Sequence, residues 1–156
     1  MSDVVHTIGI AELKVVRTPE KVRTVLGSCV GVAIFDPVGK IGGLAHVILP
    51  SSKDGHGDRG KFADTAVDWL VEELVQAGAD RQRLAAKISG GASMFGTHFD
   101  NGIGERNVQA VKERLAHHGV RLIAEVVGGL KARKMVLDPD RGQVEVQTIG
   151  AEPEIL

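Results

Sequence analysis

The chain has 156 residues, of which 43% are hydrophobic and 25% charged, and this is enough to build one soluble domain around its own core. The formal net charge is −1 and the Lys and Arg residues are scattered, so no nucleic-acid-binding surface is expected, and the apolar runs are too short for membrane insertion. A single cysteine cannot form an internal disulfide and the first residues lack a signal-peptide pattern, so the sequence predicts a cytoplasmic protein.

The first half of the chain consists of short segments rich in β-branched residues. Residues 30–35 contain no polar side chain, which predicts a strand covered on both faces. The next segment, Asp36-Pro37-Val38-Gly39, has the residue order of a type I turn and predicts a hairpin. The strands predicted in this half span residues 4–10, 13–16, 22–26, 30–35 and 41–49.

The second half contains the two long helices expected of the chain. Residues 61–77 carry an apolar stripe at helical spacing that ends at Gly78, and a second helix is expected from Asn101, as its N-cap, to about His118. A strand at 120–127 is expected to be buried, and the tail after Gly150 is expected to fray. Further strands are predicted at residues 84–88, 134–137 and 143–149, the last two as a hairpin. Many hairpin-linked strands with two helices predict a single α+β domain over residues 1–156.

The only cysteine, Cys29, follows a glycine-loosened turn, and His46 is the one polar side chain in the next apolar segment. Gly27 and Ser28 allow a sharp turn that exposes the thiol and leaves the N–H groups of Ser28 and Cys29 free to stabilise an oxyanion. His46 is the candidate base for this thiol. The less specific alternatives are an inert buried thiol and a hydrogen-bonded core histidine.

The length of the turn after Asp36 decides how Cys29 and His46 meet. A two-residue loop places them directly opposite each other, with Cβ atoms about 4.5–5.5 Å apart. A three-residue loop with Gly39 as a bulge shifts the register by one and makes them diagonal neighbours. Thr24 and Ser28 carry the nearby hydroxyls that could orient the imidazole, although Thr24 is equally explained as a β-branched strand residue.

Other polar and glycine-rich segments give weaker signals. The remaining histidines do not fall at metal-ligand spacing and there is one thiol, so no metal site is expected. The segment Ser89-Gly90-Gly91-Ala92-Ser93 lacks the lysine and the spacing of a P-loop, and it predicts a tight turn near the active site.

Five motifs follow one another along the chain: Leu26-Gly27-Ser28-Cys29-Val30, Ala45-His46-Val47-Ile48-Leu49-Pro50, Lys61-Phe62-Ala63-Asp64, Ala86-Lys87-Ile88-Ser89-Gly90-Gly91-Ala92-Ser93-Met94-Phe95 and Ile103-Gly104-Glu105-Arg106-Asn107. In this order they resemble the CheD family, the chemoreceptor glutamine deamidases of bacterial and archaeal chemotaxis. The resemblance covers about residues 8 to 149 and is specific because the motifs occur together.

The resemblance implies a cysteine hydrolase fold related to bacterial toxin deamidases, with packed, mostly antiparallel β-sheets flanked by helices. It implies Cys29 as nucleophile, His46 as general base and a threonine as the third member. The family's threonine aligns with either Arg23 or Thr24. Strand parity places Arg23 on the face of Cys29, so Thr24 in this role requires a local bulge. Residues 128–133 depart from the family's more polar segment.

The resemblance also implies a function. Cys29 would attack glutamine side chains on the cytoplasmic helices of methyl-accepting chemotaxis receptors and release glutamate through a thioester, without metal or organic cofactor. The alternative is an adaptor that binds a CheC-type response-regulator phosphatase, with the loops around Gly57 and Phe99 as contact surfaces. A third alternative is a structural protein with a buried cysteine.

Overall fold

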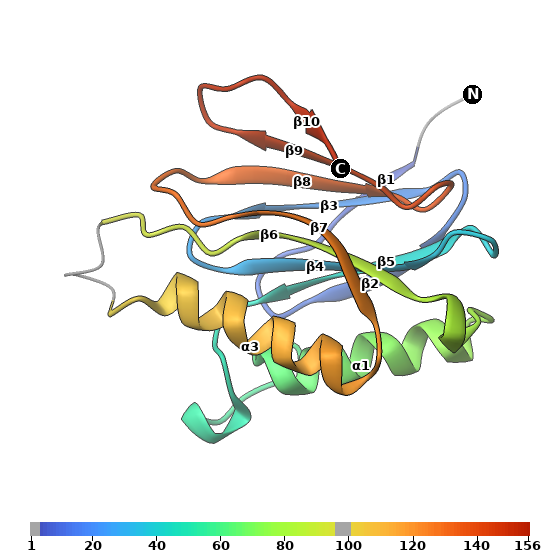
Figure 1. Ribbon diagram of the computed structural model, residues 1–156, viewed down its shortest axis with the longest axis horizontal. Helices are drawn as coiled ribbons and strands as arrows, with labels where there is room; N and C mark the ends of the chain where they lie inside the picture. Colours follow the sequence, from blue (N-terminus) through green and yellow to red (C-terminus); the bar gives the residue numbers. More distant parts are fainter. Residues whose placement is uncertain (1–3, 96–100) are drawn as a thin grey trace.

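The computed structural model describes residues 4–95 and 101–156, and this part of the chain forms two five-stranded sheets packed face to face (Figure 1). The outer sheet has the strand order β1-β3-β8-β9-β10, and the central sheet has the order β2-β5-β4-β6-β7. The strands are β1 (Val5–Thr7), β2 (Leu13–Arg17), β3 (Lys21–Leu26), β4 (Val30–Asp36), β5 (Ile41–Val47), β6 (Ala85–Gly90), β7 (Arg121–Val127), β8 (Arg133–Asp138), β9 (Gln143–Thr148) and β10 (Glu154–Ile155).

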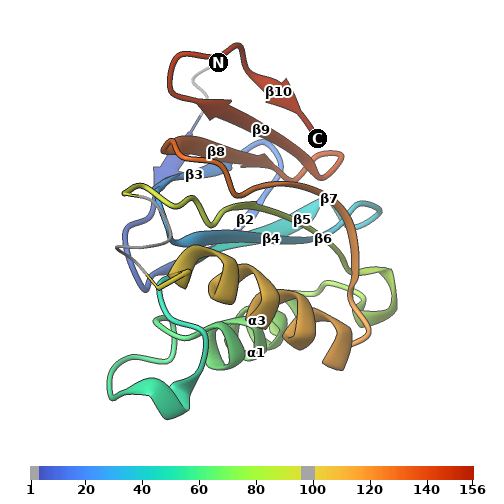
Figure 2. The same ribbon diagram turned by 60° about the vertical axis from the view of Figure 1, so that its left-hand side comes forward.

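The long helices α1 (Ala63–Gln76) and α3 (Ile103–His117) lie side by side on the free face of the central sheet (Figures 1 and 2). The outer sheet covers the other face, so the molecule has three layers. Short 3-10 turns occur at Ser52–Asp54 and Arg81–Arg83. None of the helices described is long and apolar enough to cross a membrane.

The two faces of the central sheet serve two separate cores. Side chains of α1, α3 and one face of β4 and β5 form the core on the helix side, whereas Leu44, Ala33 and the outer sheet form the inter-sheet core. Every residue of β4 and β5 is therefore buried, as the apolar segment 30–35 predicted. The predicted α+β class is confirmed, and the pairing is mostly antiparallel, with parallel pairs at β1–β3 and β6–β7.

The β4–β5 hairpin has a longer loop than either predicted register. Asp36 pairs with Ile41, which leaves residues 37–40 in the loop, and the residue in the left-handed conformation is Lys40 rather than Gly39. The Asp36 carboxylate accepts hydrogen bonds from the N–H groups of Val38 and Gly39 and so holds the wider turn. Both predicted registers are therefore wrong.

Three local expectations also differ from the structure. Gly102, one residue after Asn101, is the N-cap of α3. Strand β7 is the last strand of the central sheet and alternates between exposed and partly buried residues, and Leu122, Val126 and Val127 pack against the two cores. The chain after Gly150 does not fray, since β10 pairs with β9 through Glu154 and Ile155.

Asp36 gives a stability prediction. Its carboxylate is fully buried, and two hydrogen bonds from Arg83, together with the N–H groups of Asp80 and Gly39, hold its pKa well below the usual range. We expect Asp36→Asn to lower the free energy of unfolding at pH 7 by about 1.5–3 kcal/mol, the contribution of a charged hydrogen bond. Because the folded-state pKa is depressed, this contribution is present at neutral pH and decreases once the pH falls below about 3.9.

Urea unfolding of both proteins at several pH values measures this effect. The difference between wild type and Asp36→Asn should shrink as the pH is lowered. A difference that stays constant with pH would mean that the carboxylate charge is not what stabilises the hairpin.

Candidate active site

The structure brings Thr24 and His46 together across the two sheets. His46 lies on β5 and is 3% exposed, while Thr24 lies on β3 and is 1% exposed. The Thr24 Oγ1 and His46 Nδ1 atoms are 2.7 Å apart. Gly31 pairs with His46 and makes this approach possible, because a Cβ atom there would lie 2.5 Å from Met135 Sδ of the outer sheet.

Thr24 reaches His46 without the bulge that strand parity required. The chain passes from the outer sheet to the central sheet between β3 and β4, so side-chain alternation does not continue from Thr24 to Cys29. The pairing of β3 with β8 is regular from Val22 to Leu26. Arg23 faces outward instead, where its Nε donates a hydrogen bond to Thr7 Oγ1. The predicted bulge is therefore wrong.

The hydrogen bonds around Thr24 determine which nitrogen of His46 carries its proton. The Thr24 hydroxyl donates to the carbonyl oxygen of Ile8 at 2.9 Å. A hydroxyl has one proton, so Thr24 must accept its other hydrogen bond from His46 Nδ1–H. The Nε2 atom then carries the lone pair of a neutral imidazole, and this buried atom has no hydrogen-bond partner among the described residues. Burial lowers the pKa of His46, which keeps the ring neutral.

Cys29 lies half-buried in the turn between β3 and β4 and packs against the inter-sheet core. His46 pairs with Gly31, two residues after Cys29, so Cys29 and His46 are diagonal neighbours and not directly opposed. Such neighbours have Cα atoms about 7–8 Å apart on one face of a sheet. Burial raises the pKa of the thiol, and a hydrogen bond from the Cys29 backbone N–H lowers it in part.

Each carbonyl group of the Cys29 turn accepts a hydrogen bond. The Gly27 oxygen accepts from Ala92 N–H at 3.0 Å, the Cys29 oxygen accepts from Gly91 N–H at 2.8 Å, and the Ser28 oxygen accepts from a side chain of α3. Gly90 has a φ of +105°, and a Cβ atom there would collide with the Cys29 carbonyl. The end of β6 and the segment that follows it therefore pack tightly against this turn.

The N–H groups of Ser28 and Cys29 belong to the peptides whose carbonyls come from Gly27 and Ser28. Within residues 4–95 and 101–156, neither N–H group donates to a backbone carbonyl. In a planar trans peptide the N–H points away from the C=O. The carbonyls of Gly27 and Ser28 are held by Ala92 and by α3, so the two N–H groups point away from those donors, and the Cys29 N–H lies against its own sulfur, where an oxyanion would form.

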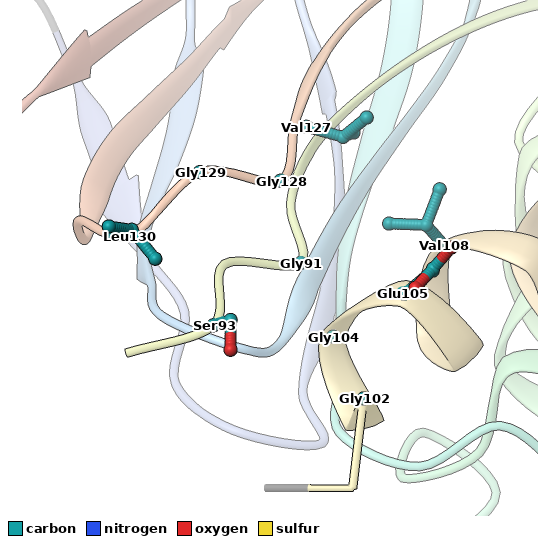
Figure 3. A pocket seen from close by; sticks show the side chains of 10 residues that line it. All are labelled: Gly91, Ser93, Gly102, Gly104, Glu105, Val108, Val127, Gly128, Gly129 and Leu130. Carbon is teal, nitrogen blue, oxygen red and sulfur yellow. The ribbon is translucent and has the colours of Figure 1, made fainter. Parts of the chain in front are cut away.

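A cavity of about 440 Å³ is lined in part by Gly91, whose N–H donates to the Cys29 carbonyl, whereas Cys29 and His46 are not among its lining residues (Figure 3). One wall is the start of α3, with Glu105 and Val108, and another is the segment after β7. Its ten lining residues are Gly91, Ser93, Gly102, Gly104, Glu105, Val108, Val127, Gly128, Gly129 and Leu130. Residues 128–130 thus line a cavity that shares Gly91 with the segment packed against the Cys29 turn.

The expectation about metal binding, the two predicted contact loops and one residue of α3 complete the description of the site. Among residues 4–95 and 101–156, no group of three or more His, Cys, Asp or Glu side chains is placed to hold a metal ion. Of the two loops predicted as contact surfaces, Gly57 is exposed, and Phe99 lies outside the described residues. Sequence reasoning gave no role to Asn107, the α3 residue whose Nδ2 donates to the Ser28 carbonyl at 3.2 Å.

A thiol, a neutral buried imidazole and a hydroxyl that accepts from that imidazole are the side chains that a cysteine-dependent hydrolase uses. Comparison with known proteins identifies the family of the chain. The model of the CheD family, described as CheD chemotactic sensory transduction, matches residues 48–148, and the chain belongs to this family.

Similar proteins extend the match over the N-terminal part that holds Cys29 and His46. The chemoreceptor glutamine deamidase CheD of Thermotoga maritima is 47% identical over 149 residues, 95% of this chain and 94% of that protein. The protein of the same name from Halalkalibacterium halodurans is 43% identical over 156 residues, 96% of each chain. The probable chemoreceptor glutamine deamidase CheD of Desulforamulus reducens is 42% identical over 155 residues, 96% of this chain and 93% of that protein.

Among solved structures, the hypothetical protein YfiH of Bacillus licheniformis is similar with a TM-score of 0.48 and 16% sequence identity. The match covers 74% of this chain and 49% of that chain.

Proposed function

We propose that this chain hydrolyses the side-chain amide of specific glutamines on methyl-accepting chemoreceptors to glutamate. Family membership and the names of relatives at 42–47% identity support this substrate class. The observation that carries the chemistry is the 2.7 Å contact between Thr24 and His46, which leaves the Nε2 lone pair of His46 available on the side of the sheet that holds Cys29. The substrate helices are cytoplasmic, so the protein is expected to act in the cytoplasm.

The first half of the reaction forms a thioester. His46 Nε2 takes the proton of the Cys29 thiol as the sulfur attacks the carboxamide carbon of glutamine. The carbonyl oxygen becomes an oxyanion, which accepts hydrogen bonds from the N–H groups of Ser28 and Cys29 in the Gly27-Ser28-Cys29 turn. The protonated imidazole then donates its proton to the amide nitrogen, the C–N bond breaks and ammonia leaves.

The second half restores the enzyme. The neutral Nε2 of His46 takes a proton from water, whose oxygen attacks the thioester carbonyl. The same N–H groups hold the oxyanion, the C–S bond breaks, and the sulfur of Cys29 regains its proton from the imidazole. The carboxylic acid that forms loses its proton to solvent and leaves glutamate, while His46 has carried the thiol proton to ammonia and one water proton to the sulfur. Thr24 keeps its hydrogen bond to Nδ1 throughout and stabilises the imidazolium.

The pH dependence follows from the burial of both groups. Burial lowers the pKa of His46 and raises that of Cys29, so the resting pair is a neutral imidazole and a thiol. The base then stays unprotonated below the ordinary histidine pKa of about 6.5. We expect kcat/KM to remain flat from below pH 6.5 to above the ordinary thiol value of about 8.5. Measuring kcat/KM from about pH 5 to about pH 10 tests this expectation. A fall in kcat/KM on the acid side with a midpoint above about 6.5 would contradict it.

The hydroxyl of Thr24 is expected to make a measurable contribution to kcat. Thr24→Val keeps the shape of the side chain but removes the acceptor for His46 Nδ1–H. We expect kcat to fall about 10-fold, because a neutral hydrogen bond contributes about 0.5–1.5 kcal/mol and 1.36 kcal/mol corresponds to tenfold in rate. The control Thr24→Ser keeps the hydroxyl and should retain most of the activity. Equal losses in the two variants would assign the effect to packing.

The proposed function is tested on the substrate itself. The wild-type chain is incubated with cytoplasmic fragments of chemoreceptors, and mass spectrometry follows conversion of glutamine to glutamate together with ammonia release. The matched control is the same chain alkylated with iodoacetamide, which reacts at the only cysteine, Cys29. Conversion by the untreated chain alone is the expected result. If the untreated chain leaves every receptor glutamine intact, the proposed function is wrong.

A further inference from the structure

Asn107 connects the two chain segments that carry the thiol and the imidazole. It lies on α3 and is fully buried. Its Nδ2 donates to the carbonyl oxygen of Ser28 at 3.2 Å and to that of Ile48 at 3.1 Å. Ser28 precedes Cys29, and Ile48 lies two residues after His46. One side-chain amide therefore bridges both halves of the site from a third element.

The orientation of this amide follows from its partners. Both partners are carbonyl oxygens, which only accept hydrogen bonds, so the NH₂ end of Asn107 must face them. The Oδ1 atom consequently points the other way, where it is buried and has no hydrogen-bond partner among the described residues. Burying an amide oxygen without a partner costs free energy. An apolar side chain would avoid that cost but would leave the carbonyl oxygens of Ser28 and Ile48 without this donor, so the amide is explained by what it does to these two carbonyls.

The carbonyl that Asn107 holds belongs to the peptide that joins Ser28 and Cys29. This peptide is planar, so fixing the direction of the Ser28 C=O also fixes the direction of the Cys29 N–H. That N–H is one of the two donors assigned to the oxyanion. A hydrogen bond to the C=O also polarises the peptide and makes its N–H a stronger donor.

We propose that Asn107 is a positioning residue that orients the Ser28–Cys29 peptide so that the Cys29 N–H stabilises the oxyanion. This inference rests on the proposed cysteine mechanism and adds to it a residue that touches neither substrate nor thiol. The bond to Ile48 holds the same amide to the segment after β5, so the position of the peptide is fixed relative to His46.

Two reactions of Cys29 separate oxyanion stabilisation from thiol reactivity. With p-nitrophenyl acetate, the sulfur attacks a carbonyl carbon, the thiol proton goes to His46, and p-nitrophenolate leaves with the electrons of the broken C–O bond. With iodoacetamide, the sulfur forms a bond to an sp³ carbon and iodide leaves, so no oxyanion forms. The ratio of the acylation rate to the alkylation rate therefore reports on the oxyanion donors.

Asn107→Leu removes both hydrogen bonds and keeps the number and branching of the side-chain heavy atoms. We expect its acylation rate to fall about 10-fold to 100-fold, because a misdirected oxyanion donor costs somewhat less than a deleted one, while the alkylation rate changes by less than about threefold. The control is Val111→Ala, which removes buried packing one turn further along α3 and should leave the ratio unchanged. An unchanged ratio in Asn107→Leu, or equal losses in both reactions, would overturn the proposal.

A second variant gives a measurement that a change in packing would not affect. The carboxyl introduced by Asn107→Asp donates a hydrogen bond only when it is protonated. Its ratio of acylation to alkylation should therefore rise as the pH falls, whereas the wild-type ratio should not. If Asn107→Leu does not fold, the pH dependence of Asn107→Asp alone tests the proposal. A ratio of acylation to alkylation that does not change with pH in Asn107→Asp overturns it. Receptor deamidation by the wild type is measured separately, so a wrong substrate and a wrong role for Asn107 are distinguishable.

Discussion

Cys29→Ala is expected to abolish receptor deamidation, with a loss in kcat on the order of 10⁶-fold, the size found when a protease loses its nucleophile. Cys29 is the only cysteine, so no second thiol can replace it. The side chain is half-buried in a turn, and its removal should leave the fold intact. Mass spectrometry of the receptor fragment measures the rate, and thermal unfolding verifies that the variant is folded.

Cys29→Ser sharpens this experiment. The hydroxyl occupies nearly the volume of the thiol but is a far weaker nucleophile at the pH of the assay, so the variant should also be inactive. In contrast, wild type quenched with acid during turnover should carry the receptor peptide as a thioester on Cys29. Deamidation by Cys29→Ala within tenfold of the wild-type rate would show that the sulfur forms no bond to the substrate.

The parts of the fold that sequence predicts are those with a local cause. The apolar segment 30–35 indicates a doubly covered strand because burial on both faces excludes polar side chains at every position. The stripe in 61–77 defines α1 in the same way. The predicted hairpin register is wrong because the Asp36 carboxylate holds a wider turn through the N–H groups of Val38 and Gly39. The same carboxylate is bound by Arg83, 47 positions away, and no local pattern shows that contact.

In the candidate site, too, sequence predicts what has a local cause and misses what depends on distant contacts. Residue types and spacing single out Cys29 and His46 and leave Thr24 as one of several candidates for the third group. The geometry of these residues depends on the crossing between sheets at the Cys29 turn, which parity within one strand cannot anticipate. Asn107 was missed although a signal exists. It is four residues before Val111 on α3 and hence on the same buried face, and an amide in an apolar stripe is a reason to look for a distant partner.

His46→Gln is expected to lower kcat by about 10²-fold to 10⁴-fold, the usual contribution of a general acid–base group. Glutamine is close to histidine in size but has no nitrogen that accepts a proton near neutral pH. The alkylation rate of Cys29 should fall as well, because the Nε2 lone pair no longer takes the thiol proton. The receptor assay and iodoacetamide kinetics measure the two effects on the same preparation.

A double-mutant cycle then shows whether Thr24 acts through the imidazole. If the hydroxyl works only by orienting His46 and stabilising its protonated form, Thr24→Val should cost activity in the wild type and almost none in the His46→Gln background. Additive losses would instead mean that the hydroxyl acts on the substrate or the fold directly. Because Thr24 comes from the outer sheet and His46 from the central sheet, a strong coupling would also show that activity depends on the packing between the two sheets.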